Sequence, residues 1–191
     1  MTAHAPKIKS VVAAFLLSLP LCPGGPALAQ AGSEKSDGLL ERLAEAEDAV
    51  TAGRIEREIR LEWSKSGSAA MDLLLKRGRD ALEVNEVGRA IDHLTALTDH
   101  APAFAEGWHA LALAYYTDER FGPAVYALER TLALNPNHFG ALRGLGAVFD
   151  QLEKPALAFD AYSRAAALRP HDEDIDAALE RLNRAARGMS L

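Results

Sequence analysis

The chain has 191 residues, of which 49% are apolar and 25% charged, a balance typical of a globular protein with a sizeable core. Twenty-one basic and twenty-seven acidic residues give a net charge of −6, which argues against nucleic acid or an anionic membrane surface as the main partner. Aromatic residues make up only 6%, and Ala and Leu fill long stretches with few β-branched neighbours. The composition therefore predicts an all-α fold.

Residues 1–29 are typical of a secretory signal peptide. Lys7 and Lys9 form a short basic start, and an apolar run follows at 11–19. Alanines then stand where a signal peptidase reads small residues, so we expect cleavage after Ala29 or Ala31. The sequence therefore predicts an exported protein, periplasmic or secreted.

Two alternatives for this segment are weaker. The apolar run is roughly half of the ~20 residues that span a bilayer, which disfavours a retained anchor and stable membrane insertion. Cys22 is the only cysteine, and Leu21 precedes it where a lipoprotein normally has a small residue. Because Cys22 lies in the segment that would be removed, the mature chain is expected to form no internal disulfide.

Five sets of residues recur at intervals of 34 positions. The sets are Pro102, Pro136 and Pro170; Ala90, Ala124 and Ala158; Gly78, Ala112 and Gly146; Leu74, Trp108 and Leu142; and Ala81, Tyr115 and Phe149. Regular self-similarity of this kind predicts a repeat architecture.

The middle unit carries a recognisable motif: Trp108-x-x-Leu111-Ala112-x-x-Tyr115, then Ala124-x-x-x-Leu128, then Pro136. This pattern resembles a tetratricopeptide repeat (TPR). The resemblance implies three repeats, at 71–104, 105–138 and 139–172. The first departs from the pattern at Arg77, where the other two have Leu111 and Leu145.

The repeat pattern also has a direct physical interpretation. Trp108, Leu111 and Tyr115 mark the apolar face of one helix, and the spacing around Leu128 marks that of a second. Each unit is thus predicted to be a helical hairpin that cannot bury both of its faces alone. Neighbouring hairpins must stack, so the expected fold is an αα-hairpin solenoid.

The flanking segments are expected to be a disordered leader at 30–38, a helical hairpin at 39–68 with a break at Gly53, and a capping helix at 173–187 behind an N-cap at Asp172. The hairpin is interpreted either as a degenerate fourth repeat or as a lid. The capping helix is expected to cover the last repeat.

No nucleophile stands beside a base, and no histidines have the close spacing of a zinc helix motif. The sequence therefore predicts neither an enzyme nor a metal or other cofactor, with His109 included among the histidines that need none. The acidic run that begins at Asp172 is explained by helix capping, because the glycine and final glutamate of a calcium loop are missing.

By resemblance, the first helix of each repeat lines a concave groove that binds extended peptides. The candidate groove residues are Arg79, Glu106, His109, Leu113, Tyr116, Arg143 and Asp150. Arg79 and Arg143 are expected to hold a carboxylate between them. The clamp that other TPR proteins use for chaperone tails is absent, since Leu75, Arg79 and Ala110 replace its residues.

These observations favour an exported, non-enzymatic adaptor or scaffold whose groove binds an extended segment of another protein. A structural role through self-association, with homo-oligomers, is the first alternative. A small-ligand carrier or an enzyme is the second.

Overall fold

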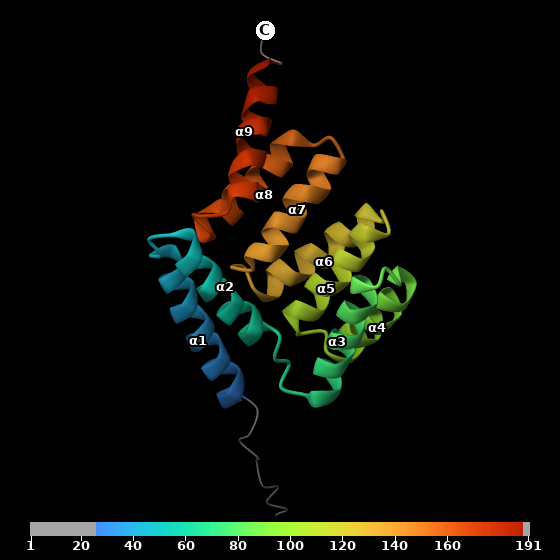
Figure 1. The fold of residues 1–191 in the computed structure, drawn as a ribbon. Coiled ribbons are helices and arrows are strands. Elements are labelled where there is room, and N and C mark those ends of the chain that lie inside the picture. Colours follow the sequence, from blue (N-terminus) through green and yellow to red (C-terminus); the bar gives the residue numbers. More distant parts are fainter. Residues whose placement is uncertain (1–25, 189–191) are drawn as a thin grey trace, which may run out of the picture.

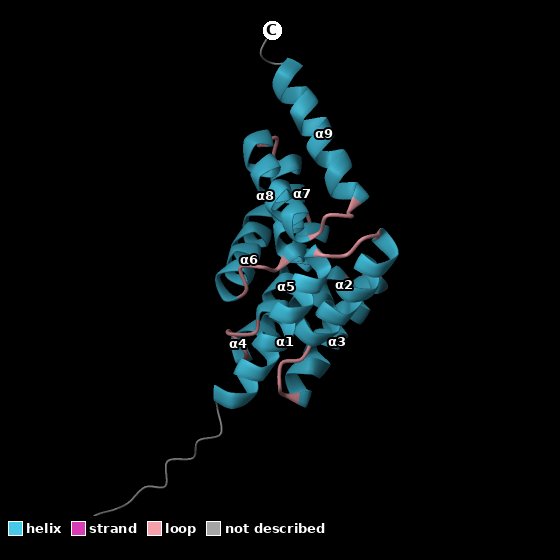
Figure 2. Cartoon of the chain, turned by 90° about the vertical axis from the view of Figure 1, so that its left-hand side faces the viewer, coloured by secondary structure: helices cyan, strands magenta, loops and turns pink. Residues whose placement is uncertain are grey.

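A computed structural model describes the backbone of residues 26–188 and the side chains of residues 35–185. Most of the predicted signal peptide lies outside this range. The described chain forms nine α-helices and no strand (Figure 2). They are α1 (Pro26–Ala44), α2 (Ala49–Trp63), α3 (Ala69–Glu83), α4 (Val87–His100), α5 (Ala105–Thr117), α6 (Phe121–Leu134), α7 (Phe139–Gln151), α8 (Pro155–Leu168) and α9 (Glu173–Gly188).

The predicted all-α solenoid is confirmed. Helices α3 to α8 form three hairpins, one for each 34-residue unit, and successive hairpins pack together (Figure 1). The first helices contact one another, α3 with α5 and α5 with α7, and therefore form the inner layer of the stack. Pro102, Pro136 and Pro170 lie in the turns between helices.

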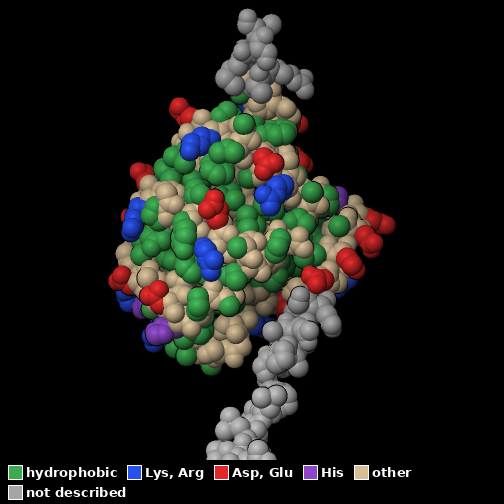
Figure 3. Space-filling view, turned by 180° about the vertical axis from the view of Figure 1, so that it is seen from behind, with side chains coloured by type: hydrophobic (Ala, Val, Ile, Leu, Met, Phe, Trp, Pro, Cys, Tyr) green, Lys and Arg blue, Asp and Glu red, His purple; other side chains and the backbone are tan. Residues whose placement is uncertain are grey.

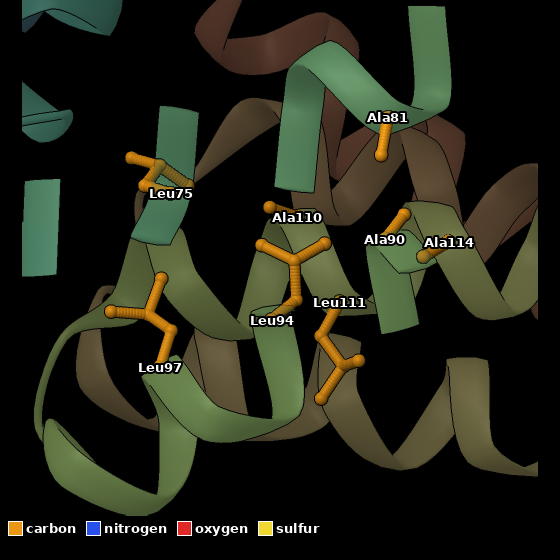
Figure 4. Packing of buried hydrophobic residues seen from close by; sticks show 8 residues of the cluster. All are labelled: Leu75, Ala81, Ala90, Leu94, Leu97, Ala110, Leu111 and Ala114. Atoms are coloured by element: carbon orange, nitrogen blue, oxygen red, sulfur yellow. The ribbon is translucent and has the colours of Figure 1, made fainter. Parts of the chain in front are cut away.

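Small side chains let the helices of neighbouring hairpins approach closely. In the first interface Ala90 of α4 and Ala110 and Ala114 of α5 are buried together with larger leucines (Figure 4). Two of these, Leu94 and Leu97, are completely buried. Such close packing gives each hairpin the cover that it lacks alone.

The turn inside each hairpin follows one backbone design. Asn85, Glu119 and Glu153 are 34 residues apart and have positive φ angles of 58°, 54° and 53°. In each case the next amide donates a 2.8 Å hydrogen bond to the carbonyl five residues earlier, on Ala81, Tyr115 or Phe149. This is the Schellman ending of an α-helix, here formed without glycine at the left-handed position.

Gly78 of α3 lies against Leu94 of α4, and this contact predicts how a larger residue at position 78 would change stability. A Cβ at Gly78 would lie 2.4 Å from the Leu94 Cγ, whereas a Cβ at Gly53, within α2, would meet only the end of Arg57 at 3.8 Å. We expect Gly78→Ala to lower the free energy of unfolding by about 1–3 kcal/mol, and Gly53→Ala to raise it by up to about 1 kcal/mol. Urea unfolding of the two variants measures the difference, and equal effects would contradict the packing of α3 on α4.

The N-terminal hairpin differs from its predicted outline in two ways. Residues 30–38 are not a disordered leader but part of α1. Gly53 is not a break, because it lies within α2. The hairpin instead turns at residues 45–48, where the Asp48 carboxylate accepts a 2.8 Å hydrogen bond from the Thr51 amide and caps α2.

The α1–α2 hairpin is not a fourth repeat stacked on the first. Its buried side chains, Leu39, Leu43, Ile55 and Ile59 among them, pack with Phe139 at the start of α7 and with Leu168 at the end of α8. Arg169 and Glu56 form an ion pair at 2.8 Å between the hairpin and the last repeat. The hairpin therefore reaches from the first repeat, to which it is linked, across to the third (Figure 1).

Helix α9 covers the other side of the last repeat. The Asp172 carboxylate accepts hydrogen bonds from the amides of Asp174 and Ile175 at 3.1 and 3.2 Å and thereby caps the helix. Ile175 and Leu182 are buried against α8. Among the described residues, no helix is both long enough and apolar enough to cross a membrane.

Candidate functional site

A groove of about 490 Å³ lies between α2 and the inner layer of the repeats, and we call it the concave groove. Helix α2 forms one wall, and α3, α5 and the start of α7 form the other. Its lining residues are Arg57, Arg60, Leu61, Trp63, Ser64, Arg79, Leu82, Glu106, His109, Ala110, Leu113, His138, Phe139 and Gly140. The volume lies in the range of sites for small ligands and short peptide segments.

Glu106 is the centre of a polar cluster at the bottom of this groove. Its side chain is only 6% exposed. Arg79 of the first repeat donates to one carboxylate oxygen, and His138 Nε2 lies 2.8 Å from the other. His109 Nδ1, one turn along α5, is 3.4 Å from the first oxygen. The carboxylate therefore joins the first repeat unit to the second, through Arg79 on one side and His138, the last residue of the second unit, on the other.

The tautomer of His138 follows from its two contacts. The Ala141 amide donates a 3.0 Å hydrogen bond to His138 Nδ1, which makes His138 the N-cap of α7. The neutral ring then carries its proton on Nε2 and donates it to Glu106. Trp63 of α2 stacks on the His138 ring with centroids 4.5 Å apart, so the α1–α2 hairpin covers one face of this ring.

Gly140 has a steric reason within the same cluster. The His109 and His138 rings lie 4.4 Å apart, and a Cβ at position 140 would come within 3.0 Å of His109 Nε2. The glycine thus makes room for the His109 ring. Gly144 is explained in the same way by Leu128.

The environment shifts the pKa of both central groups downward. For Glu106, burial favours the protonated form, but the facing His109 and His138 outweigh it and hold the pKa of the carboxyl well below its usual range. For His138, burial and the neighbouring His109 lower the pKa of the ring despite its hydrogen bond to Glu106. The cluster therefore pairs an ionised carboxylate with a neutral imidazole near neutral pH.

Acidification is expected to destabilise the fold. Because the pKa of His138 lies below its ordinary value of 6.5 in the folded protein, the unfolded chain binds more protons, and stability falls as the pH drops below that value. Glu106 adds to the loss below its ordinary value of 4.5. Urea midpoints at about pH 7.5 and about pH 5.5 measure the effect of His138. His138→Asn keeps an acceptor for the Ala141 amide and should flatten this dependence; an unchanged slope would assign it to other groups.

Three potential metal ligands meet here, because donor atoms of Glu106, His109 and His138 all lie within 4.8 Å of one another. The hydrogen bonds of these side chains argue against metal binding. Both oxygens of Glu106 have donors, and a metal on His138 Nε2 would force a proton onto Nδ1, against the Ala141 amide. We therefore describe the cluster as a hydrogen-bonded tie between repeats.

The structure divides the groove residues named from the sequence into two groups. Arg79, Glu106, His109 and Leu113 line the concave groove. Three others do not: Arg143 contacts Asp174 at 3.1 Å, Asp150 pairs with Arg181, and Tyr116 packs against Phe121. Arg143 and Asp150 thus both pair with residues of α9. The expected carboxylate site between Arg79 and Arg143 is therefore wrong, because Arg143 lies outside the groove.

Sequence reasoning missed the half of the groove that the hairpin supplies. Arg57, Arg60 and Trp63 of α2 line it, as do His138 and Phe139 at the start of α7. A signal was present in the spacing of Ile55, Ile59 and Trp63, which marks one face of a helix. That pattern does not show which distant surface the face covers.

Three stacked hairpins with a concave groove define a helical-repeat protein of the solenoid class. A TPR repeat-containing protein of Rhizobium etli is 31% identical over 139 residues, which cover 73% of this chain and 68% of that protein. The chain belongs to the tetratricopeptide repeat family. No family model matches it.

Solved structures show the same fold. The first TPR of Spaghetti (RPAP3), bound to an HSP90 peptide, has a TM-score of 0.61 at 24% identity and covers 63% of this chain and 95% of its own. The Sgt2 TPR domain from Aspergillus fumigatus has a TM-score of 0.61 at 22% identity over 64% of this chain and 83% of its own. A mutant of MamA has a TM-score of 0.54 at 20% identity, over 83% of this chain and 89% of its own.

Proposed function

We propose that this chain is an exported adaptor that binds an extended segment of another protein in the concave groove and performs no chemistry of its own. The observation that carries the proposal is the groove itself, which the first helices of the repeats line on one side and α2 on the other. The first TPR of Spaghetti with its HSP90 peptide, and the second TPR domain of RPAP3 with an HSP70 peptide, support a peptide as the ligand.

Export is the second part of the proposal and rests on the N-terminal sequence. Cleavage after Ala29 or Ala31 would remove the start of α1 but leave Leu39 and Leu43, which pack the hairpin onto the third repeat. A reporter enzyme that is active only outside the cytoplasm, fused behind residues 1–40, should be active. An inactive fusion in a functioning secretion host would contradict export.

The groove is tested with an array of synthetic hexapeptides probed with the purified chain. Leu113→Lys places a charge on the groove wall, where the Leu113 side chain is 51% exposed, and should abolish binding. Leu73→Lys is the matched control, because Leu73 is 46% exposed on α3 but does not line the groove. Failure to retain any peptide, or equal binding by both variants, would contradict the proposal.

A further inference from the structure

The concave groove is more positive than the molecule around it. The chain has a net charge of −6, and Figure 3 shows acidic side chains gathered at the edge where the α1–α2 hairpin lies, with Lys and Arg scattered. Yet three arginines, Arg57, Arg60 and Arg79, line the groove against a single carboxylate, Glu106. Because Arg79 and His138 already bind Glu106, the unbalanced charge lies on α2.

Neither of the two α2 arginines that line the groove, Arg57 and Arg60, has a carboxylate of its own. Among the described side chains, none forms an ion pair with Arg57. Arg60 lies 3.5 Å from Glu56, but Arg169 already contacts both oxygens of that carboxylate at 2.8 Å. Both residues are exposed and line the groove, and the planar donors of arginine suit a carboxylate ligand.

Beside these arginines, both walls present apolar side chains. Leu61 of α2 is 68% exposed and Leu113 of α5 is 51% exposed, although both line the groove. Leu82 and Ala110 extend the same apolar lining. Water leaves these surfaces favourably when an apolar group enters between them, so the groove suits a ligand with an apolar side chain next to an anionic group.

We infer that α2, which lies outside the repeats, determines what the groove binds: extended peptides in which a carboxylate adjoins an apolar residue. The carboxylate pairs with Arg57 and Arg60, and the apolar side chain lies between Leu61 and Leu113. The inference rests on the proposed function, because it requires a peptide in the groove. It adds that the cationic half of the site comes from the N-terminal hairpin and not from the repeats.

The test uses hexapeptides on an array in matched sets. Each acidic peptide has a counterpart with Asn and Gln in place of Asp and Glu, and each is made with a free and with an amidated C-terminus. The purified chain should retain acidic peptides that contain an adjacent apolar residue, and it should retain their Asn and Gln counterparts only where a free C-terminus supplies the carboxylate. The amidated set separates a terminal carboxylate from an acidic side chain, since only the former loses binding on amidation.

Two double variants with the same change in net charge locate the site. Arg57→Glu with Arg60→Glu should weaken binding of the acidic peptides about tenfold or more, with circular dichroism to confirm the fold. Arg42→Glu with Arg54→Glu is the control, because both arginines lie outside the groove, each 3.7 Å from Glu58. The control should bind like the unmodified chain.

The outcomes separate this inference from the proposed function. Peptides retained without preference for a carboxylate, or weakened equally by both double variants, would overturn the inference and leave the proposed function standing. An array that retains no peptide would overturn the proposed function, and the inference with it.

Discussion

Phe139→Ala is expected to lower the free energy of unfolding by about 3–5 kcal/mol and to loosen the α1–α2 hairpin from the third repeat. The Phe139 side chain is 1% exposed and belongs to the cluster of apolar residues that the hairpin buries. Trp63 packs on its ring at 4.9 Å, and the Arg169 guanidinium lies 5.2 Å from the ring centroid. Truncation therefore leaves a cavity at the junction and removes contacts from both sides of it.

Two measurements distinguish this effect from a general loss of stability. Urea unfolding gives the free energy, and limited proteolysis reports access to the linker at residues 64–68, which should be cut faster in the variant. Phe159→Ala is the control, because Phe159 lies on α8 with 37% exposure and is expected to lower stability by only about 1 kcal/mol. Similar losses in both variants, or an unchanged cutting rate, would contradict the docking of the hairpin on Phe139.

Glu106→Ala is expected to lower the free energy of unfolding by about 2–4 kcal/mol. The variant leaves the Nε2 proton of the buried His138 without an acceptor, and it removes the partner of Arg79. Because the Arg79 side chain is 38% exposed and water can hydrate it, most of the loss comes from His138.

Glu106→Gln separates charge from hydrogen bonding. Its amide oxygen still accepts the His138 proton, so we expect about half of the loss seen with alanine. Glu83→Ala, at an exposed position on α3, is the control and should leave stability nearly unchanged. Equal stability of Glu106→Ala and Glu83→Ala in urea unfolding would show that the cluster contributes nothing to the tie between repeats.

The repeat units could be predicted from the sequence because their determinants are local or strictly periodic. Helix propensity, the apolar spacing around Leu111 and Leu128, and the small residues at Gly78 and Ala90 recur every 34 positions. The same repeated residues define each hairpin and its contact with the next hairpin. The all-α solenoid and its three units followed from that pattern alone.

The candidate site could be predicted only in part. Arg79, Glu106, His109 and Leu113 fall on the inner layer because the family register places them there, and the structure puts them in the groove. Arg143 and Asp150 have the same register, but α9 folds back and pairs with them. The position of a residue within the repeat predicts which face of the stacked hairpins it lies on. It does not predict whether a segment outside the repeats, such as α9, packs over that face.

The sequence by itself determined the helices of the repeats, their period, the capping of α9 at Asp172 and the expectation of export, since each depends on local or strictly periodic patterns in the chain. Only the tertiary structure decided where the α1–α2 hairpin docks, because its contacts join segments as distant as Glu56 and Arg169. The same holds for the meeting of Glu106 with His138 beneath Trp63. Such contacts depend on how the whole chain buries its apolar surface and pairs its buried polar groups. A local sequence pattern does not determine that overall arrangement.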